Sequence, residues 1–321
     1  MPRLLKWYSF RGRVFVPVVL IIAAGLGYFG WRVHLVVRVL PTGQGPAGTA
    51  IPIEPFQSVW SDKTVVLLGV GDSVTRGYGA DQEHSFFALL QKNDDMQCAD
   101  MAGRELAAVF PNIEAYNYAV DFTTSQYHLD KQLPLIPAWP DDVAGIIVIT
   151  TGGNDLIHDY GRSAPKDGAM YGCSYEQALV WTENVKQRIG KLLEGLVAGF
   201  EGSCEIFLAN IYDPTDGLSD PYIVGFPRWS EGTRVVILMN KKIAELCDSY
   251  QNVHLVDIHS EFLGHGIHCT EWWRKHYKKD DPHYWYARNF EDPNPRGHDA
   301  IRRLFLLKMA EVLPARLSKR N

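Results

Sequence analysis

A short apolar run that ends abruptly at a polar turn constrains this chain more than any other feature. The sequence VVLL at residues 65–68 has no polar face, which is typical of a strand buried on both sides in a parallel sheet. The sequence GDS follows at residues 71–73 and opens a loop punctuated by Gly77 and Gly79. Open α/β sheets bind ligands beyond the carboxyl ends of their strands, so we expect Ser73 to lie where a ligand can reach it.

Apolar strands alternate with helical patterns along most of the chain, and this alternation predicts one α/β domain built on a parallel sheet. Strands are expected near residues 65–70, 113–118, 145–150, 205–211 and 253–256. Helices are expected near residues 86–91, 101–110, 175–199, 233–250 and 296–312. The 321 residues of the chain are enough for one large domain of this kind and an appendage.

The appendage is expected at the N-terminus. The segment from Val14 to Trp31 carries no charged residue over about one membrane thickness, and positions 3, 6, 11 and 13 before it are basic. The positive-inside rule places that basic segment in the cytoplasm and the rest of the chain on the other side of the membrane. A cleaved signal peptide is the alternative, but the run is long for one and no A-x-A site follows it.

We therefore expect residues 1–40 to form a cytoplasmic tail and a transmembrane signal anchor that holds an exported domain at the membrane. Residues 41–55 are rich in Pro and Gly and are predicted to be a linker. Residues 56–321 are predicted to form the folded domain. Basic residues gathered near the C-terminus, Arg302 and Arg303 among them, are predicted to be a solvated helix face.

The charge and the cysteines argue against several classes of protein. The formal net charge of −5 gives no reason to expect nucleic-acid binding. The five cysteines show no C-x-x-C spacing and the sequence H-E-x-x-H is absent, so we expect neither a metal nor a cofactor.

Polar loops follow two further predicted strands in the way that Ser73 follows the first. The segment IEAYNYAVDFTT at residues 113–124 carries Asn117 where its apolar part ends, and GIIVITTGGNDL at residues 145–156 runs into Asn154. The segment DPNPRGHDAIRRLF opens the last predicted helix. These four segments, in this order, resemble the SGNH or GDSL hydrolase family from about residue 64 to the C-terminus.

The resemblance implies a three-layer α/β/α sandwich with a five-stranded parallel sheet, which is the flavodoxin-like SGNH hydrolase fold. It also implies that residues 56–321 form a catalytic domain, a serine esterase that cleaves carboxylic esters through an acyl-enzyme as an esterase, a lipase-like enzyme or a deacetylase. The expected partners are an ester-bearing small molecule, a lipid or an acylated glycan.

The resemblance assigns Ser73 as the nucleophile. A serine hydroxyl needs a base within reach and donors aimed at the oxyanion that forms on the substrate. Three donors are expected: the N–H of Ser73 itself, an N–H of the loop 119–123, and the side-chain amide of Asn154.

Four residues beside these groups are expected to surround the substrate: Gly71, Asp72, Phe122 and Gly153. The family's second motif has glycines at two positions that are Ala119 and Phe122 in this chain, and Phe122 is expected to narrow the pocket. Asp72 is predicted to hold its own loop through Asx-type hydrogen bonds.

The catalytic base is the point at which this chain departs from the family's D-x-x-H-P-N motif. Aligning Pro293 and Asn294 with that motif puts Asp292 where the histidine is expected. The same alignment puts Asn289 where the aspartate is expected.

A second D-x-x-H lies upstream, and we favour it as the source of the base. It consists of Asp280 and His283, with the carboxylate expected to orient the imidazole. His298 is the alternative base, although it would lie in the first turn of a helix, where the dipole disfavours the imidazolium. His265 and His268 are further candidates.

Two other functions stay open. An acyltransferase acting on envelope glycans would share the chemistry up to the second nucleophile. A membrane-tethered binding module that has lost its catalytic base is the other, because Asp292 occupies the histidine position. The loop at residues 263–290 is dense in His and aromatic residues, and is expected to be either a lid over the core or a substrate-binding or membrane-facing rim.

Overall fold

The computed structural model describes residues 2–34 and 40–317, and its centre is a five-stranded sheet in which every pairing is parallel. The strand order is β2-β1-β3-β4-β5. The strands are β1 (Thr64–Gly71), β2 (Ile113–Asn117), β3 (Val143–Thr150), β4 (Ser203–Ala209) and β5 (Val253–Val256). All five predicted strands are present, and the predicted three-layer α/β/α fold class is confirmed.

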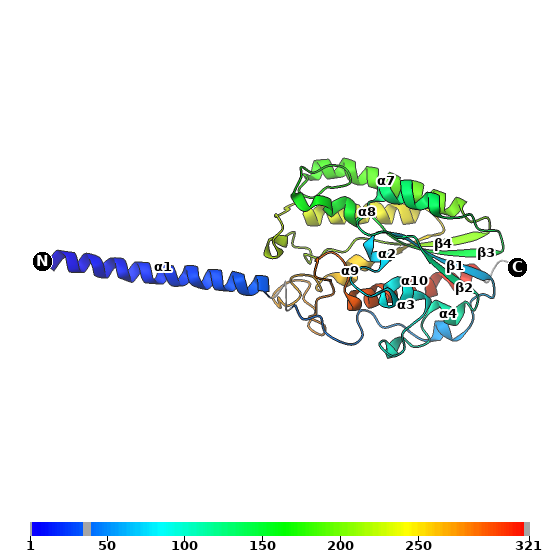
Figure 1. Ribbon diagram of the computed structural model, residues 1–321, viewed down its shortest axis with the longest axis horizontal. Helices are drawn as coiled ribbons and strands as arrows, with labels where there is room; N and C mark the ends of the chain where they lie inside the picture. Colours follow the sequence, from blue (N-terminus) through cyan, green and yellow to red (C-terminus); the bar gives the residue numbers. More distant parts are fainter. Residues whose placement is uncertain (1, 35–39, 318–321) are drawn as a thin grey trace.

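Helices cover both faces of the sheet, which is why its central strands are apolar throughout. All eight residues of β3 are buried. Figure 1 shows α7 (Tyr175–Ala198) and α8 (Gly232–Ser249) on one face, and α3 (Phe86–Gln91) and α10 (Pro295–Leu317) on the other. Two apolar cores result, one between each helical layer and the sheet.

Short helical turns occupy the connections between these elements. The α-helical turns are α2 (Ser73–Arg76), α4 (Leu106–Val109), α5 (Ser125–Tyr127), α6 (Gly153–Ile157) and α9 (Ile258–Phe262). The 3₁₀ turns are η2 (Glu54–Gln57), η3 (Gln82–His84), η4 (Ala99–Met101), η6 (Leu133–Leu135), η7 (His158–Gly161) and η8 (Pro221–Val224), and η5 (His128–Gln132) is a π-helix. The helix expected at residues 101–110 is therefore reduced to η4 and α4.

The N-terminal helix α1 (Pro2–His34) projects from one end of the domain (Figure 1). Its segment Phe15–His34 is long and apolar enough to cross a membrane, a property that a signal sequence shares. The last turns of α1 touch the domain: the ring of Phe29 lies 6.2 Å from that of Tyr222 in η8, and Arg32 forms a buried ion pair with Glu271.

The segment at residues 41–55, expected to be a linker, packs against the domain. Ala47 and Ile51 are buried, and the Ala47 N–H donates to Asp299 Oδ2 over 3.1 Å. Its apolar residues find a place on the core beside α10, so Pro and Gly serve here to shape a packed loop.

The predicted solvated face of the C-terminal helix is wrong for two arginines. Arg302 and Arg303 are buried, and their Nε atoms donate to the two carboxylate oxygens of Asp299 over 2.6 and 3.0 Å. Arg302 also donates to Asn93 and Arg303 to Asp100. Asp299 and Asp100 together therefore balance the two positive charges of this stretch of α10.

Substitution of Asp299 should destabilise the fold strongly, because it leaves two buried guanidinium groups short of a partner. We expect Asp299→Ala to lower the free energy of unfolding by about 3–5 kcal/mol. The matched control, Lys308→Ala, breaks an exposed pair with Glu311 and should cost about 1 kcal/mol or less. Urea denaturation measures both, and equal costs for the two variants would contradict this account of α10.

Candidate active site

The turn that presents Ser73 is set by its neighbours on β1 and β3. Gly71 pairs with Thr150, so the two strands end level. Gly71 has a φ of +130°, and a Cβ there would lie 2.0 Å from the Thr150 carbonyl oxygen, so only glycine fits. Asp72 caps α2: its Oδ1 accepts from the Val74 N–H over 3.2 Å and from Thr150 Oγ1 over 2.7 Å. The predicted loop-holding role of Asp72 is confirmed.

The π-helix η5 supports the same turn from behind. Gln132 accepts from the Gly71 N–H over 2.9 Å and donates to the Gly71 carbonyl over 2.7 Å. His128 is fully buried between the hydroxyls of Thr123 and Thr151, at 2.9 and 2.8 Å. Burial lowers the pKa of His128 to about 3, so the ring is neutral. No sequence pattern marked His128 or Gln132, because their role depends on contacts across the sheet edge.

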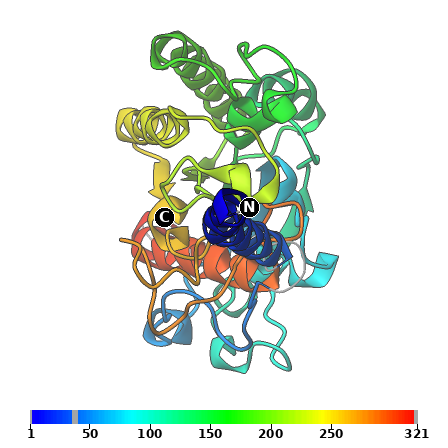
Figure 2. The ribbon, with the colours of Figure 1, turned by 90° about the vertical axis from the view of Figure 1, so that its left-hand side faces the viewer.

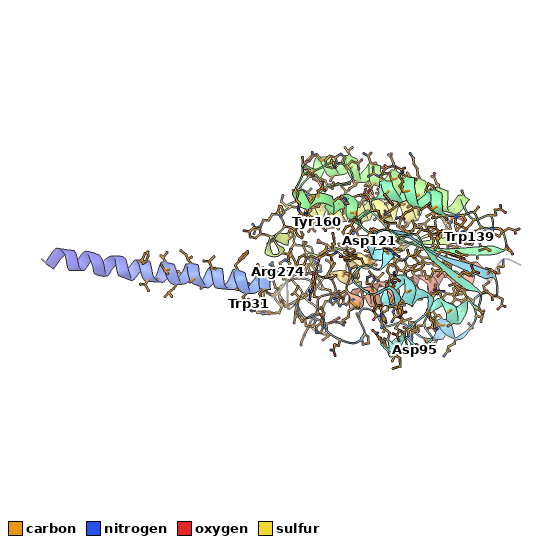
Figure 3. The ribbon with its side chains drawn as sticks, in the orientation of Figure 1. Trp31, Asp95, Asp121, Trp139, Tyr160 and Arg274 are labelled. Carbon is orange, nitrogen blue, oxygen red and sulfur yellow. The ribbon has the colours of Figure 1, made fainter. Side chains whose placement is uncertain are left out.

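A cavity of about 140 Å³ opens beside Ser73 at the carboxyl edge of the sheet. Its walls are mainly apolar and aromatic, and they include Leu156, Tyr160, Phe226, Trp229 and Phe290. Its polar end is formed by Asp72, Ser73, Asn154, Glu291 and Asp292. Tyr160 lies on the side of the domain from which α1 leaves (Figure 3).

Asp292 is the group that faces Ser73. It is 1% exposed and lies in the loop before α10, where its carbonyl oxygen accepts from the Ala287 N–H over 2.7 Å. The side-chain amide of Asn289 donates to Asp292 Oδ2 over 2.6 Å, and Asn289 Oδ1 accepts from the Asp292 N–H over 3.2 Å. Burial raises the pKa of Asp292, whereas hydrogen bonding from Ser73 and Asn289 lowers it.

Two other carboxyl groups lie at this polar end. Burial, the charge of Asp292 and then that of Asp72 raise the pKa of Glu291 to about 8. Burial also raises the pKa of Asp72 to about 7, against the hydrogen bond from Thr150 and with a contribution from the charge of Asp292. At neutral pH the three groups therefore do not all carry a charge, and Glu291, with a pKa of about 8, is mainly protonated.

Asn154 lies in α6, directly after β3, and lines the cavity together with Gly153. Its side-chain amide donates to the Thr123 carbonyl over 2.9 Å, which fixes the amide beside Ser73. In the loop expected to supply a backbone donor, two N–H groups are already engaged. That of Ala119 donates to Asn117 Oδ1 over 3.0 Å, and that of Val120 to the Gly71 carbonyl over 3.1 Å.

Phe122 does not narrow the cavity as expected. Its side chain is 57% exposed, its ring packs 6.1 Å from that of Tyr78, and it is not among the residues that line the cavity. The backbone at Phe122 has a φ of +61°, which turns the loop outward at this position. Gly71 also lies behind the cavity wall, where it packs against β3.

The structure does not bring Asp280 and His283 to Ser73. Asp280 is exposed, and the His283 Nδ1 pairs with Asp281 instead. Asp281 in turn accepts two hydrogen bonds of 3.0 Å from Arg296 in the first turn of α10. Asp281, His283 and Arg296 therefore form a structural cluster that holds the loop to α10, and neither Asp280 nor His283 lines the cavity.

The alternative histidines are also committed elsewhere. His298 is fully buried, with Nδ1 accepting from the Phe86 N–H over 3.2 Å and Nε2 donating to the Tyr78 carbonyl over 2.8 Å. His265 stacks on Trp285, and His268 pairs with Glu271 over 3.0 Å. Among the residues that the structure describes, no histidine lines the cavity that holds Ser73.

The fold is that of an α/β protein with a cavity at the carboxyl edge of its parallel sheet, and Ser73 and Asn154 line that cavity. The family model of the GDSL-like lipase/acylhydrolase family matches residues 70–300, and the chain belongs to this family. The resemblance drawn from the sequence is thereby confirmed. No curated protein was found to match the chain.

Several solved structures resemble the chain in fold at low sequence identity. An acetylxylan esterase from Geobacillus stearothermophilus has 16% identity and a TM-score of 0.46, over 78% of this chain and 95% of the other. An extracellular lipase from Streptomyces rimosus has 15% identity and a TM-score of 0.47, over 77% and 99%. A phospholipase A1 from Streptomyces albidoflavus has 16% identity and a TM-score of 0.44, over 77% and 98%.

The raised pKa of Glu291 predicts a pH dependence of stability. A carboxyl group whose pKa is raised by folding stabilises the fold below its unfolded pKa, and this contribution is lost as the pH rises towards about 8. We therefore expect Glu291→Gln to remove part of the fall in melting temperature between pH 5 and pH 8. The matched control is Glu311→Gln on the exposed face of α10, which should keep the wild-type slope. Parallel slopes for all three proteins would contradict the prediction.

Proposed function

We propose that the protein is a membrane-tethered ester hydrolase in which Ser73 is the nucleophile and the Asp292 carboxylate replaces the family's histidine as the base. The observation that carries the proposal is the placement of Asp292 against Ser73, with Asn289 bonded to its other side. Asp292 occupies the motif position of the family's histidine, and Asn289 occupies that of its aspartate.

The two replacements are electrostatically consistent with each other. An imidazole base becomes a cation when it accepts a proton, so an aspartate partner stabilises it. A carboxylate base starts as an anion, so a second carboxylate would repel it and a neutral amide donor is the better partner. Asn289 supplies that amide N–H at 2.6 Å from Asp292 Oδ2.

The reaction then follows the usual two halves of acyl-enzyme chemistry. Asp292 accepts the Ser73 proton as Oγ attacks the ester carbonyl, and the protonated carboxyl group donates that proton to the leaving alcohol. Water attacks the acyl-enzyme in the second half, with Asp292 as base again, and Ser73 is regenerated with release of the acid. In this mechanism Asn154 and the Ser73 N–H donate hydrogen bonds to the oxyanion of each intermediate.

Burial makes a carboxylate more suitable for this role than it is in water. A base is most effective when its pKa lies near the working pH, and burial raises the pKa of Asp292 from its ordinary acidic range. Glu291, with a pKa of about 8, holds a proton at neutral pH and so spares Asp292 a second negative neighbour.

The contacts of α1 support retention of the helix as an anchor. Arg32 is 6% exposed and pairs with the buried Glu271, and removal of α1 would leave Glu271 without this cation. The basic residues before the apolar segment favour an exported domain. An acyltransferase would use the same site with an alcohol in place of water as the second nucleophile.

Ser73→Ala should abolish turnover of short p-nitrophenyl esters by the purified full-length protein. Asn154→Ala should lower kcat by ~10²–10³, because one oxyanion donor is lost. Steady-state kinetics measure turnover by both variants, and labelling by a serine-reactive phosphonate reports whether Ser73 is reactive. Wild-type turnover by the Ser73→Ala protein would rule out this mechanism, and a wild-type protein that neither turns over esters nor labels would be a binding module.

Asp292→Asn should lower kcat by ~10²–10⁴, since an amide cannot accept the proton of Ser73. The double variant Asn289→Asp/Asp292→His restores the family motif. The acid limb of its pH–kcat profile should move up towards the histidine pKa of about 6.5. His283→Ala is the matched control and should keep wild-type kinetics. Loss of turnover in His283→Ala, with retention in Asp292→Asn, would return the role of base to His283.

A further inference from the structure

The carboxyl edge of the sheet and the exit of α1 lie at the same end of the domain. Figure 1 shows α2, which directly follows β1, on the side of the sheet that faces α1. Trp139, which precedes β3, lies at the opposite end (Figure 3). An apolar helix that crosses a membrane would therefore direct the end of the domain that carries Ser73 towards the bilayer.

The end of α1 is held to the domain by specific contacts on two sides. Figure 2 shows the helix leaving the middle of this face, between the segment that contains η8 and the loop at residues 263–290. Arg32 pairs with Glu271 of that loop, and Glu271 also accepts from Arg274 over 2.7 Å and pairs with His268 over 3.0 Å. Arg274 lies beside the exit of the helix (Figure 3).

The cavity beside Ser73 shares a wall with this attachment. Pro221 and Val224 of η8 line the cavity, and Tyr222 of the same turn contacts Phe29 of α1. A single turn of the chain therefore separates the end of the apolar helix from the interior of the cavity.

Two tryptophans stand next to the residue that binds Arg32. Trp272 and Trp273 are 72% and 56% exposed, and their rings lie 5.7 Å apart, edge to face. Exposed lysines follow them in the same loop, at positions 275, 278 and 279. Tryptophan with nearby basic residues is the composition of protein surfaces that lie among lipid headgroups.

The length of the apolar helix sets the level of these residues. From Phe15 to Trp31 the helix rises about 26 Å, close to the hydrocarbon thickness of a bilayer, roughly 30 Å. Arg32 follows at once, so the residues around its partner Glu271 lie where the hydrocarbon region ends. The exposed side chains of Trp272 and Trp273 are thus at headgroup level.

We infer that the loop at residues 271–279 and η8 form a membrane-contact surface, with Trp272 and Trp273 seated among the headgroups of the bilayer that α1 crosses. The cavity beside Ser73 then opens at the lipid surface, and its apolar wall receives the acyl chain of an ester carried in that bilayer. The second statement rests on the proposed ester hydrolase function, whereas the first rests on the contacts of α1 and on the proposed crossing of the membrane by this helix.

Depth-dependent quenching of tryptophan fluorescence tests the contact surface. The full-length protein is placed in lipid nanodiscs with and without brominated acyl chains, and the quenched fraction of the emission is measured. Trp272→Phe/Trp273→Phe should lower the quenched fraction, because it removes emitters near the bromines. The control Trp139→Phe should raise it, because it removes an emitter far from the bilayer. A quenched fraction that does not fall in the double variant would overturn the contact surface.

A comparison of two esters tests delivery from the bilayer. The measured quantity is the ratio of turnover of a nanodisc-embedded phospholipid to turnover of a short water-soluble ester. We expect Trp272→Ser/Trp273→Ser to lower this ratio about tenfold, and the control Trp139→Phe to leave it unchanged. An unchanged ratio in the double variant would overturn delivery. If the wild-type protein turns over neither ester, the proposed hydrolase function fails, and the quenching result still decides the contact surface.

Discussion

The junction between the ends of β1 and β3 is the constraint on which the site depends. Gly71 packs so closely on the Thr150 carbonyl that no side chain fits, and this contact brings the turn that carries Ser73 level with the end of β3. Asp72 then bonds Thr150 across the junction, and Gln132 bonds both backbone polar groups of Gly71. The turn that presents Ser73 is thus held at Gly71 through both of that residue's backbone polar groups, which fixes the position of the turn.

If Asp292 is the base, as proposed, its exchange for histidine keeps the electrostatic balance at the polar end of the cavity. A carboxylate in the histidine position would be unstable beside the family's aspartate, and this chain has an amide there instead. Burial raises the pKa values of Asp72, Glu291 and Asp292, and the charge of Asp292 adds to the shifts of the other two groups. The histidines of the same loops stabilise the fold: His298 joins α10 to the loop after α2, and His283 joins an ion-pair cluster with Asp281.

The proposed orientation of this site towards a membrane follows from the place at which the N-terminal helix is attached. A helix attached at the amino edge of the sheet would direct Ser73 away from a bilayer, whereas attachment beside η8 directs it towards one. The buried pair between Arg32 and Glu271 makes the helix end part of the folded domain. The proposed tethering and the proposed orientation therefore depend on the same contacts.

The sequence by itself determined the fold class, the order of the strands along the chain and the family, because buried parallel strands are apolar throughout and the motifs follow their ends. It also showed that Asp292 and Asn289 occupy the positions of the family's histidine and aspartate. Only the tertiary structure decided where the histidines lie. Spacing along a loop does not say which way the loop folds. Asp280 and His283 therefore matched the D-x-x-H motif, although His283 pairs in the structure with Asp281, which also binds Arg296. His128 and Gln132 stayed unmarked for the same reason: His128 contacts Thr151 after β3, and Gln132 contacts Gly71 at the end of β1, 61 residues away in the sequence.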